Sequence, residues 1–296
     1  MLNNLLRNSN RRSSQKRGVR WWVLIVFGAY AAYYWLSNQQ EAAFTGRNQL
    51  IASAVEQEQR LGLQAYTQIL AQSKVLAADA PLSAQVRSIA ERLILVAPDL
   101  ERAIAEQRGV QASARWDSFA WEINVLDAQE ANAFCLPGGK MAIYTGILPI
   151  AKNADGLAVI LGHEIAHALL RHAGERMAQQ RLVQMGGAAA GMAVGDMPAQ
   201  QQQLIMAVLG AGSQYGVLLP FSRQHETEAD EVGLLLAAAA CFDPAEAPKL
   251  WARMQQKNAA APAQWQSSHP SNQARIAHLQ SIQKSAAKLA KQFCPG

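Results

Sequence analysis

Residues 157–173 read LAVILGHEIAHALLRHA, and this stretch decides both the fold and the chemistry of the chain. It contains no proline and predicts a helix, on which side chains four positions apart lie on one face. His163 and His167 are therefore placed to bind one Zn²⁺ through their imidazole nitrogens. Glu164 could reach a water on that metal and act as general base, then as general acid. The alternative, two ordinary helix histidines, stays open because unrelated proteins also contain this pattern.

A catalytic zinc needs at least one further protein ligand and one open position for water and substrate. Residues 222–233 read SRQHETEADEVG, which predicts a second helix that offers Glu226 as this ligand. Asp230 follows one turn later and could orient a ligating imidazole through its free N–H. Glu228 lies two residues from Glu226, on another face of the helix, and is the weaker candidate. The sequence thus predicts one zinc ion per chain.

The other histidines and cysteines favour structural roles. His172 lies five residues after His167, about 140° around a continuous helix, so it would not share the metal. The three cysteines, Cys135, Cys241 and Cys294, lack metal-ligand spacing. Three buried thiols are the preferred interpretation. In an oxidising compartment the alternative is a disulfide between Cys241 and Cys294.

The chain begins with a basic tail followed by an apolar segment. Residues 1–20 contain six Lys and Arg and no acidic residue, so the net charge of +5 leaves −1 for the other residues and argues against a nucleic-acid-binding surface. Residues 21–37 are uncharged, with aromatic residues at both ends, and predict a transmembrane anchor. A cleaved secretory signal is the alternative. The basic end should stay in the cytoplasm, which places residues 38–296 on the other side as the catalytic domain.

Hydrophobic periodicity predicts a mostly helical α+β fold with a small sheet. Alternating apolar residues predict a half-buried strand at residues 118–126. After residue 147 the sequence is helical, with an interruption at Gly186 and Gly187 among others. Pro98 ends or kinks the second of the helices predicted before the sheet. The remaining predicted elements are helices at 51–76 and 83–97 and short strands at 132–136 and 140–145, around a turn at 137–139.

Two further apolar segments, residues 186–195 and 204–219, raise the question of a second membrane contact. Each is shorter than a membrane span. A close-packed buried helix pair is the preferred interpretation, and a re-entrant or lipid-facing element is the alternative.

Several motifs together resemble those of one enzyme family. They are NAFCLPGG at residues 132–139, YTG at 144–146, LGHEIAHA at 161–168, SRQHETEAD at 222–230 and SHP at 268–270. In this order and spacing the chain is similar to the HtpX and CAAX-prenyl-protease superfamily of zinc metallopeptidases. It is most similar to the BepA, LoiP and mitochondrial Oma-type branch, which acts in envelope quality control.

This resemblance implies a gluzincin-like metallopeptidase domain, with His163, His167 and Glu226 as metal ligands and Glu164 as general base and acid. It also implies roles at the substrate cleft. Asn132, Ala133 and Phe134 would form an edge strand that pairs with an extended substrate, although a core strand remains equally open. His269 could stabilise the oxyanion, or close the site as a reversible ligand, or belong to a structural turn. Arg275 is expected to form a salt bridge.

We therefore expect a membrane-anchored zinc metalloendopeptidase that cleaves unfolded or misassembled envelope proteins in quality control. Two alternatives remain: a non-proteolytic holdase that retains the fold, and a metal-dependent hydrolase of small amides. The expected location is the bacterial inner membrane with the catalytic domain in the periplasm, and the mitochondrial inner membrane is the alternative.

Overall fold

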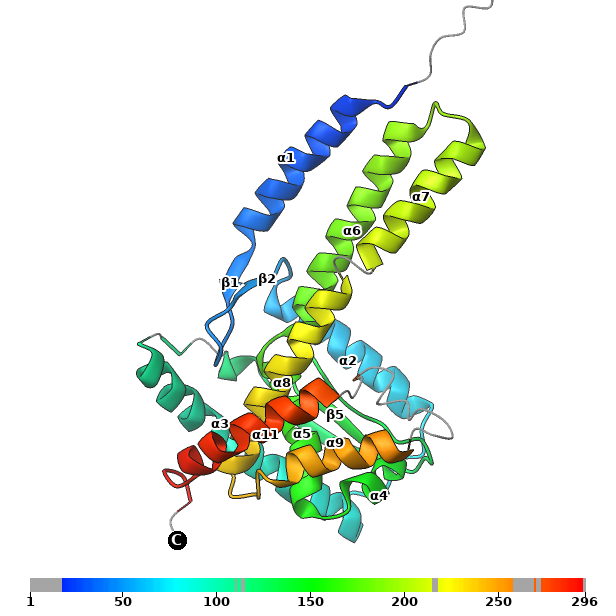
Figure 1. The fold of residues 1–296 in the computed structure, drawn as a ribbon. Helices are drawn as coiled ribbons and strands as arrows, with labels where there is room; N and C mark the ends of the chain where they lie inside the picture. Colours follow the sequence, from blue (N-terminus) through cyan, green and yellow to red (C-terminus); the bar gives the residue numbers. More distant parts are fainter. Residues whose placement is uncertain are drawn as a thin grey trace, which may run out of the picture.

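The structure is a computed structural model of the chain, which describes residues 18–109, 111–112, 115–214, 218–257, 269 and 273–294. It consists of a mainly helical body and an arm that extends from it (Figure 1). The arm comprises α1 (Trp21–Ser37), the outer part of α6 (His172–Val194) and α7 (Ala199–Ser213). Most of the basic tail predicted at residues 1–20 lies outside the described residues.

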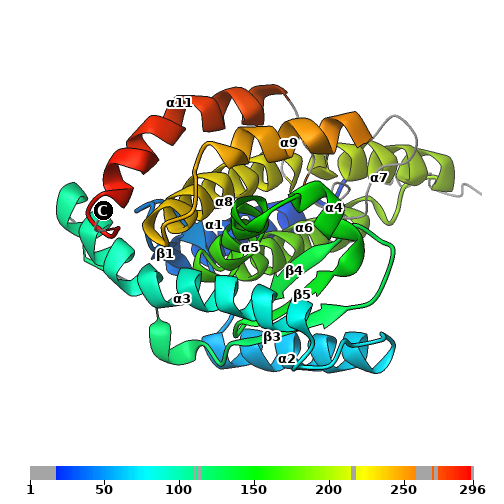
Figure 2. The ribbon, with the colours of Figure 1, turned by 90° about the horizontal axis from the view of Figure 1, so that it is seen from below.

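The centre of the body is α5 (Ala154–Leu169), which carries the HExxH sequence. Almost every side chain of α5 is buried, as expected for a helix that is apolar on all sides. The helix begins at Asn153, whose side-chain oxygen accepts a hydrogen bond from the Gly156 N–H at 2.8 Å. Figure 2 shows α5 surrounded by other elements of the body. The helices that pack on α5 include α3 (Pro81–Arg108), α8 (Leu219–Ala239) and α9 (Glu246–Lys257).

The small sheet lies beside α5 and has the order β3-β5-β4. β3 (Glu122–Leu126) is parallel to β5 (Lys140–Tyr144), and β4 (Ala133–Leu136) is antiparallel to β5. β4 is therefore an edge strand of this sheet, and it contacts α5. α2 (Val55–Ala71) also packs on β4 and β5, where the Tyr66 hydroxyl donates to the Met141 carbonyl at 2.9 Å.

A short hairpin joins the arm to the body. β1 (Gln39–Glu41) pairs antiparallel with β2 (Asn48–Leu50), directly after α1. At the other end of the chain, α11 packs on α8 and α9, and a disulfide joins Cys241 to Cys294. The remaining described elements are α4 (Leu148–Ala151), α11 (Gln273–Ala290) and the 3₁₀ turns η1 (Trp116–Ser118) and η2 (Thr145–Ile147).

The helices of the arm pack on one another through small residues. Val23 of α1 is buried against Ala189 and Ala193 of α6. At the tip, the Arg20 guanidinium donates to the Asp196 carboxylate at 2.7 and 2.9 Å. Among the residues that the structure describes, none of the helices meets both the length and the hydropathy that crossing a membrane requires.

The helical class and the three strands of the small sheet are confirmed, but the first strand begins at Glu122 and not at residue 118. Two expectations about the helices are corrected. α6 continues through Gly186 and Gly187, and Gly186 lies against the Phe27 ring, which a Cβ atom there would approach to 3.2 Å. At Pro98, where the sequence predicted either an end or a kink, α3 does not end but continues to Arg108. The expectation of a buried helix pair is wrong for α7, which has no buried residue. The helix predicted at residues 21–37 is present with these bounds.

The cysteine expectation is also corrected. The preferred interpretation of three thiols is wrong, since Cys241 and Cys294 are joined and Cys135 alone is free. The disulfide attaches the end of α11 to the end of α8, two elements that are far apart in sequence but neighbours in the body.

Candidate metal centre

The contact between α5 and α8 places the predicted ligands on two facing helices. The closest approach is at Gly162 and Gly233, where a side chain on either residue would collide with the other helix. A Cβ atom on Gly233 would lie 2.7 Å from the His163 backbone nitrogen. Because the helices touch here, His163 and Glu226 can reach one point in space.

Four side chains form a group that could hold a metal ion. His163, His167, Glu226 and His269 each offer one ligand atom, and these atoms all lie within 4.8 Å of one another. The Nε2 atoms of His163 and His167 are 3.1 Å apart, and each lies 3.5 Å from a Glu226 carboxylate oxygen. Tetrahedral zinc with ligands at about 2.0–2.1 Å keeps its ligand atoms about 3.3 Å apart. The spacing of these residues therefore fits a zinc ion.

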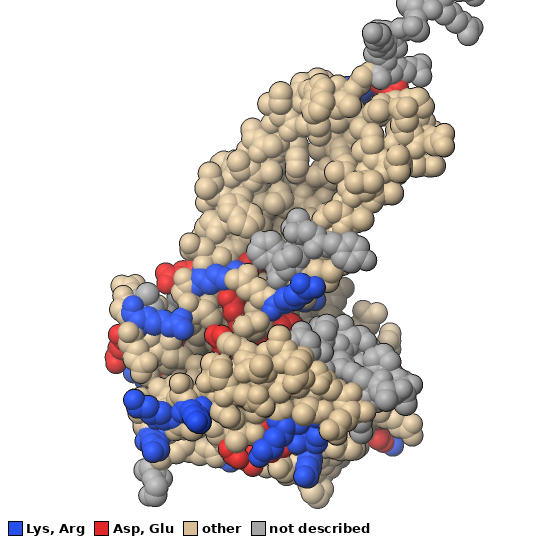
Figure 3. All heavy atoms as spheres, viewed as in Figure 1, with Lys and Arg blue, Asp and Glu red and all other residues tan. Residues whose placement is uncertain are grey.

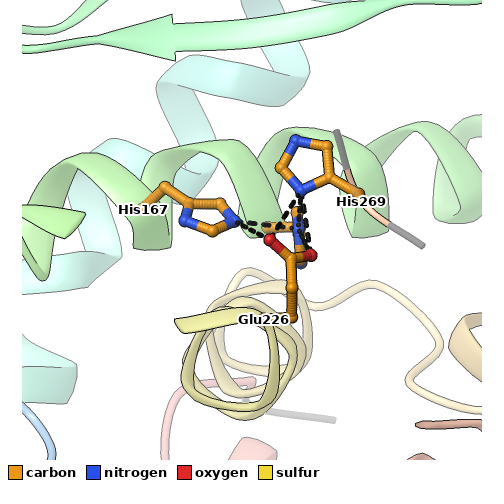
Figure 4. A group of neighbouring side chains, drawn as sticks. His167, Glu226 and His269 are labelled. Atoms are coloured by element: carbon orange, nitrogen blue, oxygen red, sulfur yellow. Dashed lines mark hydrogen bonds and ion pairs between the residues drawn. The ribbon is translucent and has the colours of Figure 1, made fainter. Parts of the chain in front are cut away.

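His269 completes this group from the C-terminal part of the chain. Its Nδ1 atom lies 3.2 Å from His163 Nε2 and 2.9 Å from a Glu226 oxygen. In Figure 4, His167 and His269 point toward the Glu226 carboxylate from separate elements. The Nε2 atom of His269 lies 3.5 Å from the Glu164 carboxylate. His269 thus stands where a catalytic zinc would keep its open position, next to the predicted general base.

The buried carboxylate of Asp230 contacts His163 through the ring nitrogen that does not face the metal group. The Nδ1 atom of His163 lies 3.1 Å from Asp230, which was predicted for this role. Arg275 donates two hydrogen bonds to Asp230, each of 2.7 Å, and lies 3.1 Å from Glu226. The expected salt bridge of Arg275 is confirmed. The contact with Asp230 at Nδ1 orients the His163 ring so that its Nε2 atom is directed toward the metal group.

The second histidine is held by another histidine. The Nδ1 atoms of His167 and His172 are 2.8 Å apart, and His172 Nε2 lies 3.1 Å from Glu228. His172 does not belong to the HExxH helix, because α5 ends at Leu169 and His172 begins α6 after a left-handed residue at Arg171. The prediction that His172 is no metal ligand agrees with this position, although it assumed one continuous helix.

Behind Glu228 lies a buried charged cluster of Arg47, Glu175, His225 and Glu228. Arg47, at the end of the β1–β2 turn, donates to Glu228 at 2.5 Å and to Glu175 at 2.6 and 2.9 Å. Glu175 also contacts His225 at 2.8 Å. Burial alone would raise the pKa of Glu175, but the hydrogen bonds from Arg47 and His225 lower it to about 2. The cluster joins α6, α8 and the hairpin at the base of the arm.

Burial and neighbouring charges determine the protonation of the metal group. Burial lowers the pKa of His167, and the nearby histidines add to this, so its imidazole is kept neutral and able to bind a metal. For Glu226, the histidine contacts outweigh burial and lower the pKa far below its ordinary value. Burial lowers the pKa of His172 to about 4 against the opposing hydrogen bond to Glu228. Neutral His172 can therefore accept the N–H of His167.

A cavity of about 400 Å³ opens beside the metal group. Its lining includes Glu164, His167 and His269 together with Phe134 and Cys135 of the edge strand β4. One side of β4 pairs with β5, and the strand borders this cavity. An extended chain lying in the cavity could add to the sheet along β4 and pass the metal group.

The structure brings together every predicted residue of the metal group and its support, and it adds residues that the sequence gave no reason to choose. Arg47 is a single arginine in a short hairpin without periodicity. Glu175 follows Arg171 in a stretch for which the sequence predicted only helical structure. The two-residue spacing from Glu226 correctly predicted that Glu228 lies on another face of the helix. On that face Glu228 contacts His172 and not the metal group.

Comparison with known proteins gives one matching family. A sequence model of peptidase family M48 matches residues 95–283, which include all four members of the metal group.

The similar proteins include fungal, animal and bacterial metallopeptidases. Mitochondrial metalloendopeptidase OMA1 of Schizosaccharomyces pombe is 32% identical over 265 residues, covering 86% of this chain and 70% of that protein. Human metalloendopeptidase OMA1 is 35% identical over 182 residues, covering 59% of this chain and 35% of that protein. The β-barrel assembly-enhancing protease of Escherichia coli is 28% identical over 158 residues, covering 52% of this chain and 32% of that protein.

Proposed function

This chain belongs to peptidase family M48 and is a metalloendopeptidase, and we propose that it uses a zinc ion held by His163, His167 and Glu226. The observation that carries this proposal is the convergence of these three side chains next to Glu164 and the cavity along β4. Two imidazoles and a carboxylate are a ligand set that zinc peptidases use. Two buried carboxylates support the ligands: Asp230 contacts His163 directly, and Glu228 contacts His172, which contacts His167.

The residues of the site would have separate roles in peptide hydrolysis. The backbone of β4 would align an extended substrate, which fixes the position of the scissile bond. A bound zinc would polarise the substrate carbonyl and lower the pKa of a water molecule. Glu164 would take the proton of the attacking water and later give it to the leaving amine. The burial of Glu164 beside the cavity leaves it accessible only from the substrate side.

His269 would have to move before substrate enters the site. In this arrangement four protein groups surround the metal position, whereas a catalytic zinc keeps three protein ligands. We assign His269 the role of a reversible fourth ligand that closes the resting site. This choice between the alternatives rests on the Nδ1 atom of His269, which lies 3.2 Å from His163 Nε2, close to the spacing of two zinc ligands, and within hydrogen-bond distance of Glu226.

The proposed location is a membrane, with the catalytic body outside the cytoplasm. α1 follows six basic residues and exposes many apolar side chains, as expected for an attachment segment. The disulfide between Cys241 and Cys294 favours an oxidising compartment such as the bacterial periplasm. The relatives named after mitochondria keep the mitochondrial inner membrane as the alternative. A reporter enzyme fused after residue 296 should be active only outside the cytoplasm.

The proposed substrates are unfolded or misassembled proteins of the envelope. An extended, flexible chain is what an edge strand can bind, whereas a folded protein would not fit into the cavity along β4. The name of the Escherichia coli relative refers to β-barrel assembly, which agrees with this substrate class.

The decisive experiment compares the full chain with Glu164→Gln in detergent. We expect about one zinc per chain in both proteins, since the ligands are intact, and cleavage of casein by the parent alone. Glu106→Gln, an exposed glutamate of α3, is the matched control and should cleave like the parent. Zinc binding without cleavage of any unfolded protein would instead support the non-proteolytic holdase.

A further inference from the structure

The arm exposes an apolar surface that the peptidase activity does not use. We propose that the hairpin of α6 and α7 is embedded in a lipid bilayer together with α1, with the tip of the arm in contact with anionic head groups. This extends the membrane attachment proposed above from one helix to three. It does not depend on peptidase activity.

Exposure of large hydrophobic side chains is concentrated on the arm. Of the sixteen such side chains in the described part of the chain, eight lie on α1, one on α6 and three on α7. Those on α6 and α7 are Met192, Leu204, Val208 and Leu209. Soluble proteins rarely expose apolar patches larger than a few hundred Å². α7 buries no residue at all, so its apolar side chains do not contribute to the core of the body.

Charged residues are missing from the same surface. Residues 21–40, 182–195 and 197–222 contain no Asp, Glu, Lys or Arg. Figure 3 shows the arm as a nearly continuous uncharged surface, whereas basic and acidic side chains cover the body in the same view. The charged residues at the tip, Arg20 and Asp196, are paired with each other. A charged side chain inside the hydrocarbon core of a bilayer has a high free-energy cost unless it is paired or reaches the interface. Arg20 and Asp196 are paired and therefore meet this condition.

The packing inside the arm also suits a lipid environment. Small residues of α6, including Ala189 and Ala193, let α1 approach closely, as in helix pairs within membranes. α6 lies between α1 and α7, and both outer helices expose apolar side chains (Figure 1). A protein partner would have to surround the arm to cover these surfaces, whereas a bilayer does so without further contacts.

Exposed aromatic side chains lie near both ends of α1, as expected for a helix in a bilayer. Trp21 and Trp22 are exposed near the tip, and Tyr33 and Trp35 are exposed near the body. Trp and Tyr concentrate at the two interfaces of a membrane. The basic residues that precede Trp21 in the sequence complement anionic head groups, which selects a negatively charged lipid surface.

Site-directed fluorescence on the full chain tests this inference. We would use the Cys135→Ser, Glu164→Gln protein, in which the remaining cysteines form the disulfide and self-cleavage is prevented. A polarity-sensitive dye is attached to Val208→Cys on α7, to Ile25→Cys on α1, or to Leu95→Cys on α3. These positions are 63%, 71% and 77% exposed, so that Leu95 is a matched control on the body. The proteins are reconstituted in vesicles of phosphatidylcholine with a minority of phosphatidylglycerol.

For Val208→Cys and Ile25→Cys we expect a blue shift, quenching by lipid that carries a nitroxide on its acyl chain, and little quenching by iodide. Leu95→Cys should show the reverse. Quenching of Val208→Cys by iodide would overturn the inference, whether or not Ile25→Cys is in lipid. Shielding of Val208→Cys from both quenchers would also overturn it, because the helix would then be buried against protein. Unchanged circular dichroism of each labelled protein establishes that the fold is intact.

Discussion

His167 and His172 face each other through their Nδ1 atoms at 2.8 Å, on the side of His167 that points away from Glu226. A hydrogen bond between them requires one imidazole to donate and the other to accept. If His167 donates, its Nε2 lone pair is available to a metal, and His172 can donate from Nε2 to Glu228. Thus His172 holds a metal ligand in the correct tautomer and orientation without touching the metal.

His172→Ala should therefore weaken zinc binding by roughly 10- to 100-fold, the usual effect of removing a residue that orients a ligand. The measurement is the zinc dissociation constant by competition with a chelator. His278→Ala is the matched control, because His278 also contacts a glutamate, Glu231, at 2.8 Å but lies away from the metal group. Equal effects of the two substitutions would contradict a positioning role for His172.

The two glutamates of α8 should differ in their effect on metal content. Glu226→Ala removes a ligand atom and should reduce zinc well below one per chain. Glu228→Ala should leave zinc bound at saturating metal, with a lower affinity that reflects the loss of support for His172. Elemental analysis after gel filtration distinguishes the two. If Glu228→Ala lost zinc while Glu226→Ala kept it, the ligand assignment would be wrong.

The glycine contact between α5 and α8 should limit what the site tolerates. Gly233→Ala places a Cβ atom 2.7 Å from the His163 backbone, so the helices must separate. We expect a loss of about 1–3 kcal/mol in the free energy of unfolding, as for other overpacked sites, together with weaker zinc binding. Gly187→Ala is the control, since no atom lies within 4 Å of its Cβ position, and it should raise helix stability by up to about 1 kcal/mol. Urea unfolding and zinc titration measure both effects.

The amino-acid sequence predicted the parts of the site that depend on local spacing. Glu164 and the two histidines of α5 follow from four-residue spacing on one helix, and Glu226 follows from a second helix with an acidic face. The first strand followed from two-residue alternation, and the other two were predicted on either side of the turn at residues 137–139. Arg47 could not be predicted, because its contacts with Glu175 and Glu228 join segments separated by more than a hundred residues.

Hydropathy also could not predict which apolar helices are buried in protein and which lie at the surface. An apolar helix that is buried in protein and one that faces lipid have the same composition, and only the packing distinguishes them. For α5 the surrounding elements cover every side, whereas α7 lies at the outside of the arm with no buried residue. The glycines at 186 and 187 suggested a break for a related reason: glycine weakens an isolated helix, but here Gly186 provides space for Phe27.

The buried charged cluster predicts a loss of stability in acid. The pKa of Glu175 is about 2 in the folded protein, below the ordinary value of 4.5. A group with a lowered folded pKa contributes its full stabilisation above pH about 4.5 and loses it as the pH falls toward 2. This contribution is on the order of 3 kcal/mol. Urea unfolding of metal-free parent and Glu175→Gln should show a difference at pH 7 that shrinks at pH 3. A difference that does not change with pH would contradict it, and Glu122→Gln, at an exposed position, should differ little from the parent.

His269 gives the last prediction, because the two roles considered for it at the metal site have opposite consequences. As a fourth ligand it blocks the open position that a catalytic zinc requires, so His269→Ala should bind zinc through three protein ligands and cleave casein faster than the parent. As a donor to the oxyanion, its removal would instead slow cleavage by about 10²–10³-fold at unchanged zinc content. The distances of 2.9 Å to Glu226 and 3.2 Å to His163 favour the first outcome. The measurement is the initial rate of casein cleavage per bound zinc, with His278→Ala as control, and slower cleavage by His269→Ala would reverse the assignment.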